Sequence, residues 1–423
     1  MMKILWFANT PCGAVKKLTG QNVVSGSWLF ALSECLKSKN DIDLHIAFYW
    51  GTPIKPFRYE GITYHPILRT GGNSILGRYL YRIRELFINN ENKKEIEKCL
   101  VIVKQIQPDL IHIHGTEENF GLIAEKIDNN NILLSIQGLL NPYFCKLYSG
   151  YSEYDLLKHE NLVHKICFDG IKANKIRFFR KAIRESKILS LINNIVGRTT
   201  WDYSCTLALN PNRRYFIVNE ILRREFLENK WEPLKEGDNF NIVSTVSSGL
   251  YKGLETIYRT AQTLKDMGIY VNWNVIGISP NDKIAKMTES ILRIKSTQVG
   301  IKLRGLKNAS EMVDIMLDSN VFVQVSHIEN SPNSLCEAMA LGMPIIATFA
   351  GGTSSIIDDQ SEGVLVQDGD PFVLAGSIIE NKNNPEKYYK MADKARARAL
   401  SRHSNKNVLN ELINTYRIVL NDK

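Results

Sequence analysis

Short apolar runs alternate with longer amphipathic stretches along the chain. In the first half the apolar runs cover residues 4–8, 44–49, 110–114 and 132–136, with a shorter one at 195–196. Strands that are buried on both faces read as continuous apolar runs, and helices that cover them show one apolar face. The alternation therefore predicts an α/β fold of the doubly wound type, with parallel sheets covered by helices.

The same pattern restarts after a polar, charged stretch at 219–240, which we interpret as an interdomain linker. Strands are expected at 242–246, 271–276 and 321–325, and a helix at 254–267. Since 423 residues exceed one ordinary hydrophobic core, we predict two domains. Their expected bounds are 1–218 and 241–400.

Residues 401–423 are expected to form a separate amphipathic helix. Its apolar stripe has to pack on another part of the protein, and it either closes the second domain or crosses back onto the first. The stripe consists of Val408, Leu409, Leu412, Ile413, Tyr416, Val419 and Leu420.

Composition indicates a globular protein of the cytoplasm. Hydrophobic residues make up 44% and charged residues 23% of the chain. No apolar run approaches the ~20 residues of a membrane-spanning helix, and residues 4–8 fit a buried strand better than a secretory signal. The seven cysteines are odd in number and never spaced as CxxC, which argues against zinc or disulfides.

The net charge of +9 comes from the first 200 residues, and it is densest at 158–187. This stretch is either a solvated basic helix face or a surface that contacts anionic lipid at the inner face of a membrane. Nucleic acid is the least favoured partner, because no recognition motif accompanies the charge.

Candidate chemistry concentrates at 321–352. The carboxyl end of a buried parallel strand opens on the ligand-binding edge of its sheet. A helix is expected to start directly afterwards, with Ser331 as N-cap and Pro332 at the first helical position. The backbone amides of Asn333, Ser334 and Leu335 would then form an anion site suited to a diphosphate.

Two carboxylates bracket this helix start. Glu337 lies inside the helix at an offset that suits ribose hydroxyls, and Glu329 lies before the turn, on the side of the group attached to the distal phosphate. Each residue alone could be an ordinary surface charge. Their combination with the strand, the helix start and Gly351-Gly352 favours a binding site.

This segment resembles the signature of the retaining glycosyltransferase family 4, in which two glutamates are separated by seven residues and followed here by AMALGMPIIAT and a GG. The resemblance extends to PDLIHIHG at 108–115, to YKG at 251–253 and to the terminal helix. It implies the GT-B fold, two Rossmann-like domains that face each other across a cleft. The first would bind the acceptor and the second the nucleotide sugar, and the terminal helix would pack on the first.

The resemblance also implies roles for individual residues. Glu329 and Lys252 would be catalytic, with Lys252 on the diphosphate and Glu329 on the donor sugar. The family often carries an arginine before the lysine; here Ser247 and Ser248 occupy that region, so Arg304 or Arg198 would have to supply the charge. The donor-binding residues would be Glu337, Asn333, Ser334, Leu335, Ser247, Ser248 and Arg304.

On the acceptor side, many family members place a histidine where this chain has Gln137. His114, at the end of its strand, is a second candidate, although it shares a strand face with His112 and could serve only in packing. Ser25 and Gly26 lie in a small-residue loop, 20–27, where the acceptor could approach.

The predicted function is metal-independent, retaining transfer of a sugar from a nucleotide-diphosphate sugar to a glycan or lipid-linked acceptor, in bacterial surface polysaccharide synthesis (capsule, O-antigen or exopolysaccharide). No cofactor or metal is expected, because Asp368-Gly369-Asp370 precedes Pro371 and fits a turn better than a metal motif. Two alternatives stay open: a nucleotide-sugar 2-epimerase of related fold, and a non-catalytic nucleotide-sugar-binding module.

Overall fold

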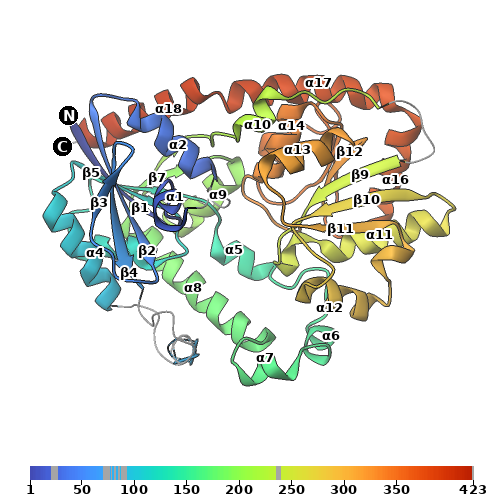
Figure 1. The fold of residues 1–423 in the computed structure, drawn as a ribbon, viewed down its shortest axis with the longest axis horizontal. Helices are drawn as coiled ribbons and strands as arrows, with labels where there is room; N and C mark the ends of the chain where they lie inside the picture. The colour runs from blue at the N-terminus through green and yellow to red at the C-terminus, as the bar shows by residue number, and fades with distance from the viewer. Residues whose placement is uncertain are drawn as a thin grey trace. The chain divides into compact units, whose positions relative to one another are not determined.

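The chain divides into two compact units. A computed structural model describes residues 1–20, 27–69, 77, 79, 80, 82, 83, 86, 93–234 and 240–421. The first unit comprises Met1–Cys145, Asn161–Ile221 and His403–Lys423, and the second Lys146–Glu160 and Leu222–Arg402 (Figure 1). The chain therefore passes between the units several times rather than once.

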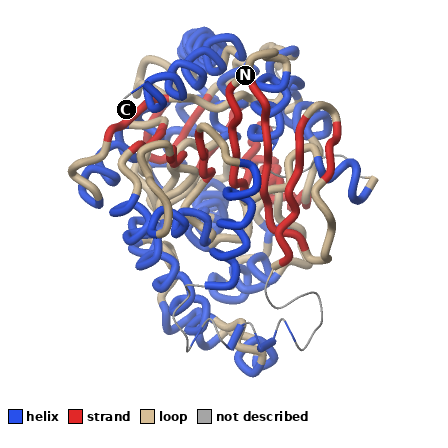
Figure 2. The backbone as a smooth tube through the Cα atoms, turned by 90° about the vertical axis from the view of Figure 1, so that its left-hand side faces the viewer, coloured by secondary structure: helices blue, strands red, loops and turns tan. Residues whose placement is uncertain are grey.

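The first unit is built on a mainly parallel sheet. Within the described residues it has eight strands in the order β3-β4-β2-β1-β5-β6-β7-β8, and β3 alone runs antiparallel to its neighbour. Figure 2 shows its longer strands side by side with helices around them. The strands are β1 (Met2–Ala8), β2 (Ile42–Trp50), β3 (Phe57–Tyr59), β4 (Ile62–Leu68), β5 (Leu110–His114), β6 (Ile132–Ser135), β7 (Asn194–Gly197) and β8 (Arg214–Ile217).

Both faces of this sheet are covered. In β1, Ile4 and Trp6 pack into one hydrophobic cluster, and Leu5 and Phe7 pack into another on the opposite face. This explains why the strand is a continuous apolar run. The helical segments of the first unit are α1 (Ala14–Thr19), α2 (Ser27–Lys37), α4 (Lys93–Ile106), η1 (Asn119–Glu125), α5 (Leu140–Cys145), α7 (Leu162–Ile166), α8 (Ile171–Leu191), α9 (Thr200–Leu209) and α18 (Asn405–Asn421).

The terminal helix α18 completes the core of the first unit. Its apolar stripe, from Val408 to Val419, is buried in the same cluster as β1 and α2. The indole Nε1 of Trp6 donates to the Tyr416 hydroxyl at 2.9 Å, and that hydroxyl also contacts Nδ1 of His112 at 2.8 Å. Of the two options that the sequence leaves open, the helix packs on the unit that contains β1.

The second unit holds a parallel sheet. In the described part of the chain this sheet has six strands in the order β11-β10-β9-β12-β13-β14. Neighbouring residues of one strand again serve opposite faces, since Ile242 and Val243 belong to different clusters. The strands are β9 (Phe240–Thr245), β10 (Val271–Ile276), β11 (Ile301–Gly305), β12 (Val321–Gln324), β13 (Ile345–Thr348) and β14 (Val364–Val366).

Helices cover both faces of the second sheet. One cluster includes residues of α11 and α16, and the other residues of α13, α14 and α17 (Figure 1). The helical segments are α6 (Glu153–Lys158), α10 (Arg224–Glu228), η2 (Leu250–Lys252), α11 (Leu254–Asp266), α12 (Lys283–Leu292), η3 (Ser296–Gln298), α13 (Ala309–Leu317), α14 (Asn333–Leu341), α15 (Thr353–Ile356), α16 (Pro371–Asn383) and α17 (Pro385–Arg402).

The stretch expected to be a linker, 219–240, is largely part of the second unit where the structure describes it. Leu222, Phe226 and Trp231 are buried in the cluster that contains α14. The Trp231 indole Nε1 donates to the carbonyl of Ser319 at 2.8 Å. The prediction of a linker was based on the high charge of this stretch. Its three buried apolar residues are spaced too irregularly to predict a helix.

A second segment lies in a different unit from the one its position in the sequence suggests. Residues 146–160, inside the stretch expected to be the first domain, belong to the second unit. Among the helices that the structure describes, none is long and apolar enough to span a bilayer.

Candidate functional site

Glu329 lies in a buried loop at the carboxyl end of β12. Its side chain is 10% exposed, and Oε1 accepts hydrogen bonds from Ser326 Oγ at 2.8 Å and from Lys252 Nζ at 2.5 Å. The backbone carbonyl of Glu329 accepts from the amide of Gly352 at 2.9 Å, which brings the GG sequence against this loop. The loop is thus fixed by both side-chain and backbone contacts.

Lys252 ends the short helix η2, which follows β9. Because β9 and β12 are adjacent parallel strands, their carboxyl ends meet, and residues far apart in sequence become neighbours. Gly253 has φ +77°, and a Cβ there would lie 2.0 Å from the carbonyl oxygen of Val325, so the close approach requires glycine. Partial burial lowers the pKa of Lys252, but the Glu329 carboxylate outweighs this and raises it, so the ammonium stays charged.

Helix α14 begins one residue later than expected. Pro332 is its N-cap, rather than Ser331, and Asn333 is its first residue. Pro332 has no side-chain group that could cap this start. The Pro332 carbonyl accepts from the amides of Leu335 at 3.0 Å and Cys336 at 3.2 Å. The Leu335 amide was expected to contribute to the anion site, but it is bonded within the helix instead. The amides of Asn333 and Ser334 are left as the donors of this helix end.

Glu337 faces a residue that the sequence analysis missed. Its side chain is 4% exposed, and Arg223 holds it in a fork, with Nε to Oε1 and Nη2 to Oε2 both at 2.7 Å. Arg223 is the N-cap of α10, in the stretch expected to be a linker. A carboxylate oxygen has two lone pairs, and the fork uses one on each oxygen.

The remaining donor-side candidates are less closely connected to Lys252. Ser247 and Ser248 are exposed residues between the end of β9 and η2. Arg304 is an exposed residue of β11, an edge strand, and its Nε donates to Asn274 Oδ1 at 2.8 Å. Arg198, in the first unit, is buried against the ring of Trp28 and lies 3.5 Å from Glu220.

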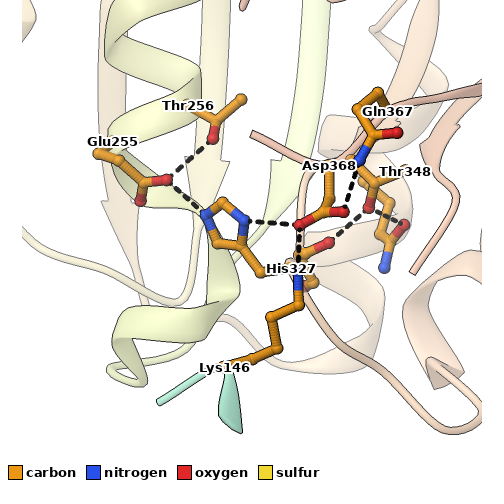
Figure 3. A network of polar contacts seen from close by, with 9 residues as sticks. Lys146, Glu255, Thr256, His327, Thr348, Gln367 and Asp368 are labelled. Atoms are coloured by element: carbon orange, nitrogen blue, oxygen red, sulfur yellow. Dashed lines mark hydrogen bonds and ion pairs between the residues drawn. The ribbon is translucent and has the colours of Figure 1, made fainter. Parts of the chain in front are cut away.

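His327 is the second residue that the sequence analysis missed. It lies two positions before Glu329, with a carboxylate on each ring nitrogen (Figure 3). One of these carboxylates belongs to Asp368, within the DGD sequence, and Asp370 caps α16 through the amides of Phe372 and Val373. The expected turn before a helix is confirmed at this point.

In the first unit the acceptor-side candidates lie at the carboxyl edge of the sheet. His114 ends β5, is 1% exposed and packs edge-on against Trp6 at 4.5 Å. Burial holds its pKa well below the usual value, so the imidazole is neutral. Gln137 follows β6, and its Oε1 accepts from Asn9 Nδ2 at 3.2 Å. Ser25 and Gly26 lie outside the described residues.

The second unit is a Rossmann-like domain: a parallel sheet covered by helices, with a lysine, two buried glutamates and a helix start at its carboxyl edge, where such sheets bind ligands. Residues 225–398 match the family model described as "Glycosyl transferases group 1". The second unit thus carries a group 1 glycosyltransferase domain.

Two curated relatives are named glycosyltransferases. An uncharacterized glycosyltransferase of Methanocaldococcus jannaschii is 25% identical over 303 residues, 69% of this chain and 84% of the relative. WcaL of Salmonella typhimurium, a putative colanic acid biosynthesis glycosyltransferase, is 26% identical over 135 residues, 30% of this chain and 32% of the relative.

Solved structures of low identity share the fold over essentially the whole chain. Sucrose-phosphate synthase from Thermosynechococcus elongatus has a TM-score of 0.71 at 15% identity, with 100% of both chains covered. HepE of Anabaena, solved in complex with UDP and glucose, has a TM-score of 0.62 at 14% identity, covering 99% of this chain and 100% of that one. The architecture is therefore GT-B, as the resemblance implies.

Proposed function

We propose that the protein transfers a sugar, with retention and without a metal, from a nucleoside diphosphate sugar to a glycan or lipid-linked acceptor in the synthesis of a bacterial surface polysaccharide. The relative WcaL, named for colanic acid biosynthesis, supports the pathway class. HepE, whose structure contains UDP and glucose, supports a nucleotide-sugar donor.

The observation that carries the proposal is the Lys252–Glu329 pair between two adjacent strand ends. A nucleoside diphosphate is the leaving group, so catalysis depends on stabilising the charge that develops on the distal phosphate. Lys252 supplies a positive charge, and the amides of Asn333 and Ser334 supply donors at the positive end of a helix dipole. Glu329 is then released to accept hydrogen bonds from hydroxyls of the donor sugar.

Glu337 is proposed to hold the ribose. The Arg223 fork fixes its carboxylate in one orientation, so little side-chain entropy is lost when the hydroxyls bind. Ser247 and Ser248 precede Lys252 on the same strand end and are proposed as further donor contacts. Arg304 is proposed to lie at the periphery of the donor site, because its guanidinium already donates to Asn274.

The acceptor is proposed to bind at the carboxyl edge of the first sheet. His114 and Gln137 lie on this edge, and Asn9 connects Gln137 to the end of β1. Ser25 and Gly26, which lie outside the described residues, are proposed as further acceptor contacts. A neutral His114 acts here by hydrogen bonding or shape, since the buried ring is not charged.

A lipid-linked acceptor requires contact with a membrane, and α8 offers a suitable surface. Ile176, Phe179 and Ile183 lie on one helix face with exposures of 45%, 49% and 55%. Lys172 is exposed beside them, and the neighbouring α7 exposes three more large apolar side chains. Apolar residues flanked by lysine and arginine are typical of helices that lie in the headgroup layer of an anionic membrane.

Two basic residues of this stretch do not belong to that surface. Arg177 is buried, and its guanidinium donates to the Phe168 carbonyl and to Asp169. Arg184 is buried and donates to Asn119 Oδ1 at 3.1 Å. The lipid-facing set is therefore smaller than the sequence suggests.

Absence of a metal requirement is proposed because the diphosphate charge is met by Lys252 and a helix start. The carboxylates of the DGD sequence are already engaged, Asp368 by His327 and Lys146, and Asp370 by the start of α16. Neither is therefore poised as a cation ligand.

Two substitutions test the proposal. Glu329→Ala should abolish transfer with a modest loss of UDP affinity, and Glu337→Ala should mainly weaken UDP affinity. UDP, GDP and ADP and their glucose and N-acetylglucosamine derivatives are first screened by thermal shift, since a ligand at 100 times its dissociation constant stabilises by about 2.7 kcal/mol. Equal losses of nucleotide affinity in both variants would contradict the assigned roles. Turnover of the donor without any acceptor would indicate the epimerase instead.

A further inference from the structure

The side chain of His327 is buried between two carboxylates from different elements. Nε2 lies 2.6 Å from Glu255 Oε1, in the first turn of α11, and Nδ1 lies 3.1 Å from Asp368 Oδ2, in the turn before α16 (Figure 3). The three side chains are 3%, 1% and 12% exposed. An ionised carboxylate only accepts hydrogen bonds, so a ring that binds both must donate from both nitrogens, as an imidazolium does.

The charge on this ring follows from its neighbours. Burial lowers the pKa of His327, but hydrogen bonds and charge from Glu255, and then from Asp368, outweigh burial and raise the pKa above its usual value. Two titratable residues of 146–160 also face this network: Lys146 Nζ lies 3.2 Å from Asp368 Oδ2, and the Tyr151 hydroxyl interacts electrostatically with Glu255.

His327 also connects the two loops that carry the proposed donor site. Its backbone amide donates to the carbonyl of Tyr251 at 2.8 Å, directly before Lys252. Glu255 follows Lys252 by three residues, and Glu329 follows His327 by two. His327 belongs to the same loop as Glu329. It binds the segment around Lys252 twice, with its backbone amide on Tyr251 and with its side chain on Glu255.

The same carboxylates hold a segment that enters the second unit from elsewhere in the chain. This strap, residues 146–160, begins with Lys146 on Asp368. At Gly150 the backbone passes so close to Glu255 that a Cβ would lie 2.0 Å from Oε1. Tyr151 and His159 then bind α12, at Thr288 (2.6 Å) and Ser290 (2.8 Å). The strap thus contacts both carboxylates of the His327 network.

We propose that His327 is a positioning residue that keeps the Lys252 and Glu329 loops in register and docks the strap 146–160 beside them, so that donor binding and strap docking are coupled. The effect on donor binding rests on the proposed function, whereas the effect on the strap does not. His327→Gln places both N–H donors on a single nitrogen, whereas the imidazole donates to Glu255 and Asp368 from two separate ring nitrogens, so this substitution should release one side of the network.

Hydrogen exchange of the full chain without nucleotide tests the structural part. His327→Gln should speed exchange in both the strap and residues 250–256, and Lys146→Gln should speed it in the strap alone. Lys390→Gln, on an exposed lysine of α17, is the matched control for lysine loss. Wild-type exchange in both regions of His327→Gln would overturn the proposal, even if that variant were less stable overall.

The pH dependence of UDP affinity tests the coupling. The docked network is complete at pH values below the pKa of His327 and is lost as pH rises through that raised pKa. Wild-type affinity should therefore fall on the alkaline side. Asp368→Asn should move this fall to lower pH, because one of the two carboxylates that raise the pKa is gone, and His327→Gln should lack it.

At the optimal pH, His327→Gln should lower kcat/KM about 10- to 100-fold, mainly through KM, as expected when a site is displaced by about 1 Å. An alkaline fall that Asp368→Asn does not move would overturn the coupling. If wild-type protein bound neither UDP nor any other nucleotide, the proposed function would fail. The hydrogen-exchange result would still show whether His327 docks the strap.

Discussion

The fork between Arg223 and Glu337 allows stability and nucleotide affinity to be separated by substitution. Arg223→Met keeps an unbranched apolar stem but removes the guanidinium, so the Glu337 carboxylate, which is 4% exposed, loses both of its bonds to Arg223. Removing one partner of a buried ion pair typically costs about 3–5 kcal/mol. Glu337→Met leaves Arg223 unpaired instead, but that side chain is 20% exposed and stays partly hydrated, so the loss of stability should be smaller.

The two variants should rank oppositely in affinity for UDP. Glu337→Met removes the proposed ribose acceptor and should weaken binding about tenfold or more, equivalent to about 1.4 kcal/mol. Arg223→Met retains the acceptor and should weaken binding less, once the measurement is made where the protein is folded. In a unit of this size about 1 kcal/mol shifts Tm by about 2–4 °C, so Arg223→Met should lower it by about 6–20 °C.

Thermal unfolding followed by circular dichroism measures the first effect, and titration calorimetry with UDP at low temperature measures the second. The adjacent Arg224 provides a matched control, since it is 83% exposed and pairs only with Glu228 of its own helix among the described residues. Arg224→Met should leave both quantities unchanged. Equal decreases in Tm and in UDP affinity for Arg223→Met and Glu337→Met would refute the assignment of stability to Arg223 and ribose binding to Glu337.

Three further outcomes are expected. Transfer activity should survive EDTA, and loss on chelation with recovery on added Mn²⁺ or Mg²⁺ would refute the metal-free mechanism. Tyr416→Phe should destabilise the first unit by about 2–4 kcal/mol in denaturant titrations, because an indole N–H and an imidazole nitrogen lose their shared buried partner; a change below about 0.5 kcal/mol would contradict this. The protein should float with anionic liposomes at low salt, and it should no longer do so when two lysines and an arginine of α8 are replaced by glutamine. In the control variant, three exposed lysines of α17 are replaced by glutamine, and flotation should be unchanged. The α8 variant carries these changes at Lys172, Lys175 and Arg180.

The long apolar strands were predictable because both of their faces are buried. Val271–Ile276 was predicted with the bounds that β10 has in the structure. Among the strands that were not predicted, β8 and β11 lie at sheet edges, where exposed side chains break the apolar run. The order of the strands depends on contacts between distant segments, and no local pattern encodes it.

The site divides in the same way. Glu329 was predicted from its place between a strand and a helix start and Lys252 from the family resemblance, and the structure brings them together at the ends of adjacent strands. Arg223 was missed because its partner Glu337 is 114 positions away and its own neighbourhood reads as a charged linker. His327 was missed because both of its carboxylate partners come from other elements. Its position two residues before Glu329 could have marked His327 as a candidate site residue, but no local pattern identifies its partners.

The segment composition of the two units affects how the protein can be made and divided. Chain synthesis proceeds from the N-terminus, yet the hydrophobic core around Trp6 is completed by α18, at 405–421. The first unit therefore has an open apolar surface throughout translation of the second, and a chaperone is expected to bind it during that interval. For the same reason a fragment ending near residue 218 should aggregate when expressed alone. Grafting residues 403–421 after residue 221 through a short flexible linker should restore its solubility.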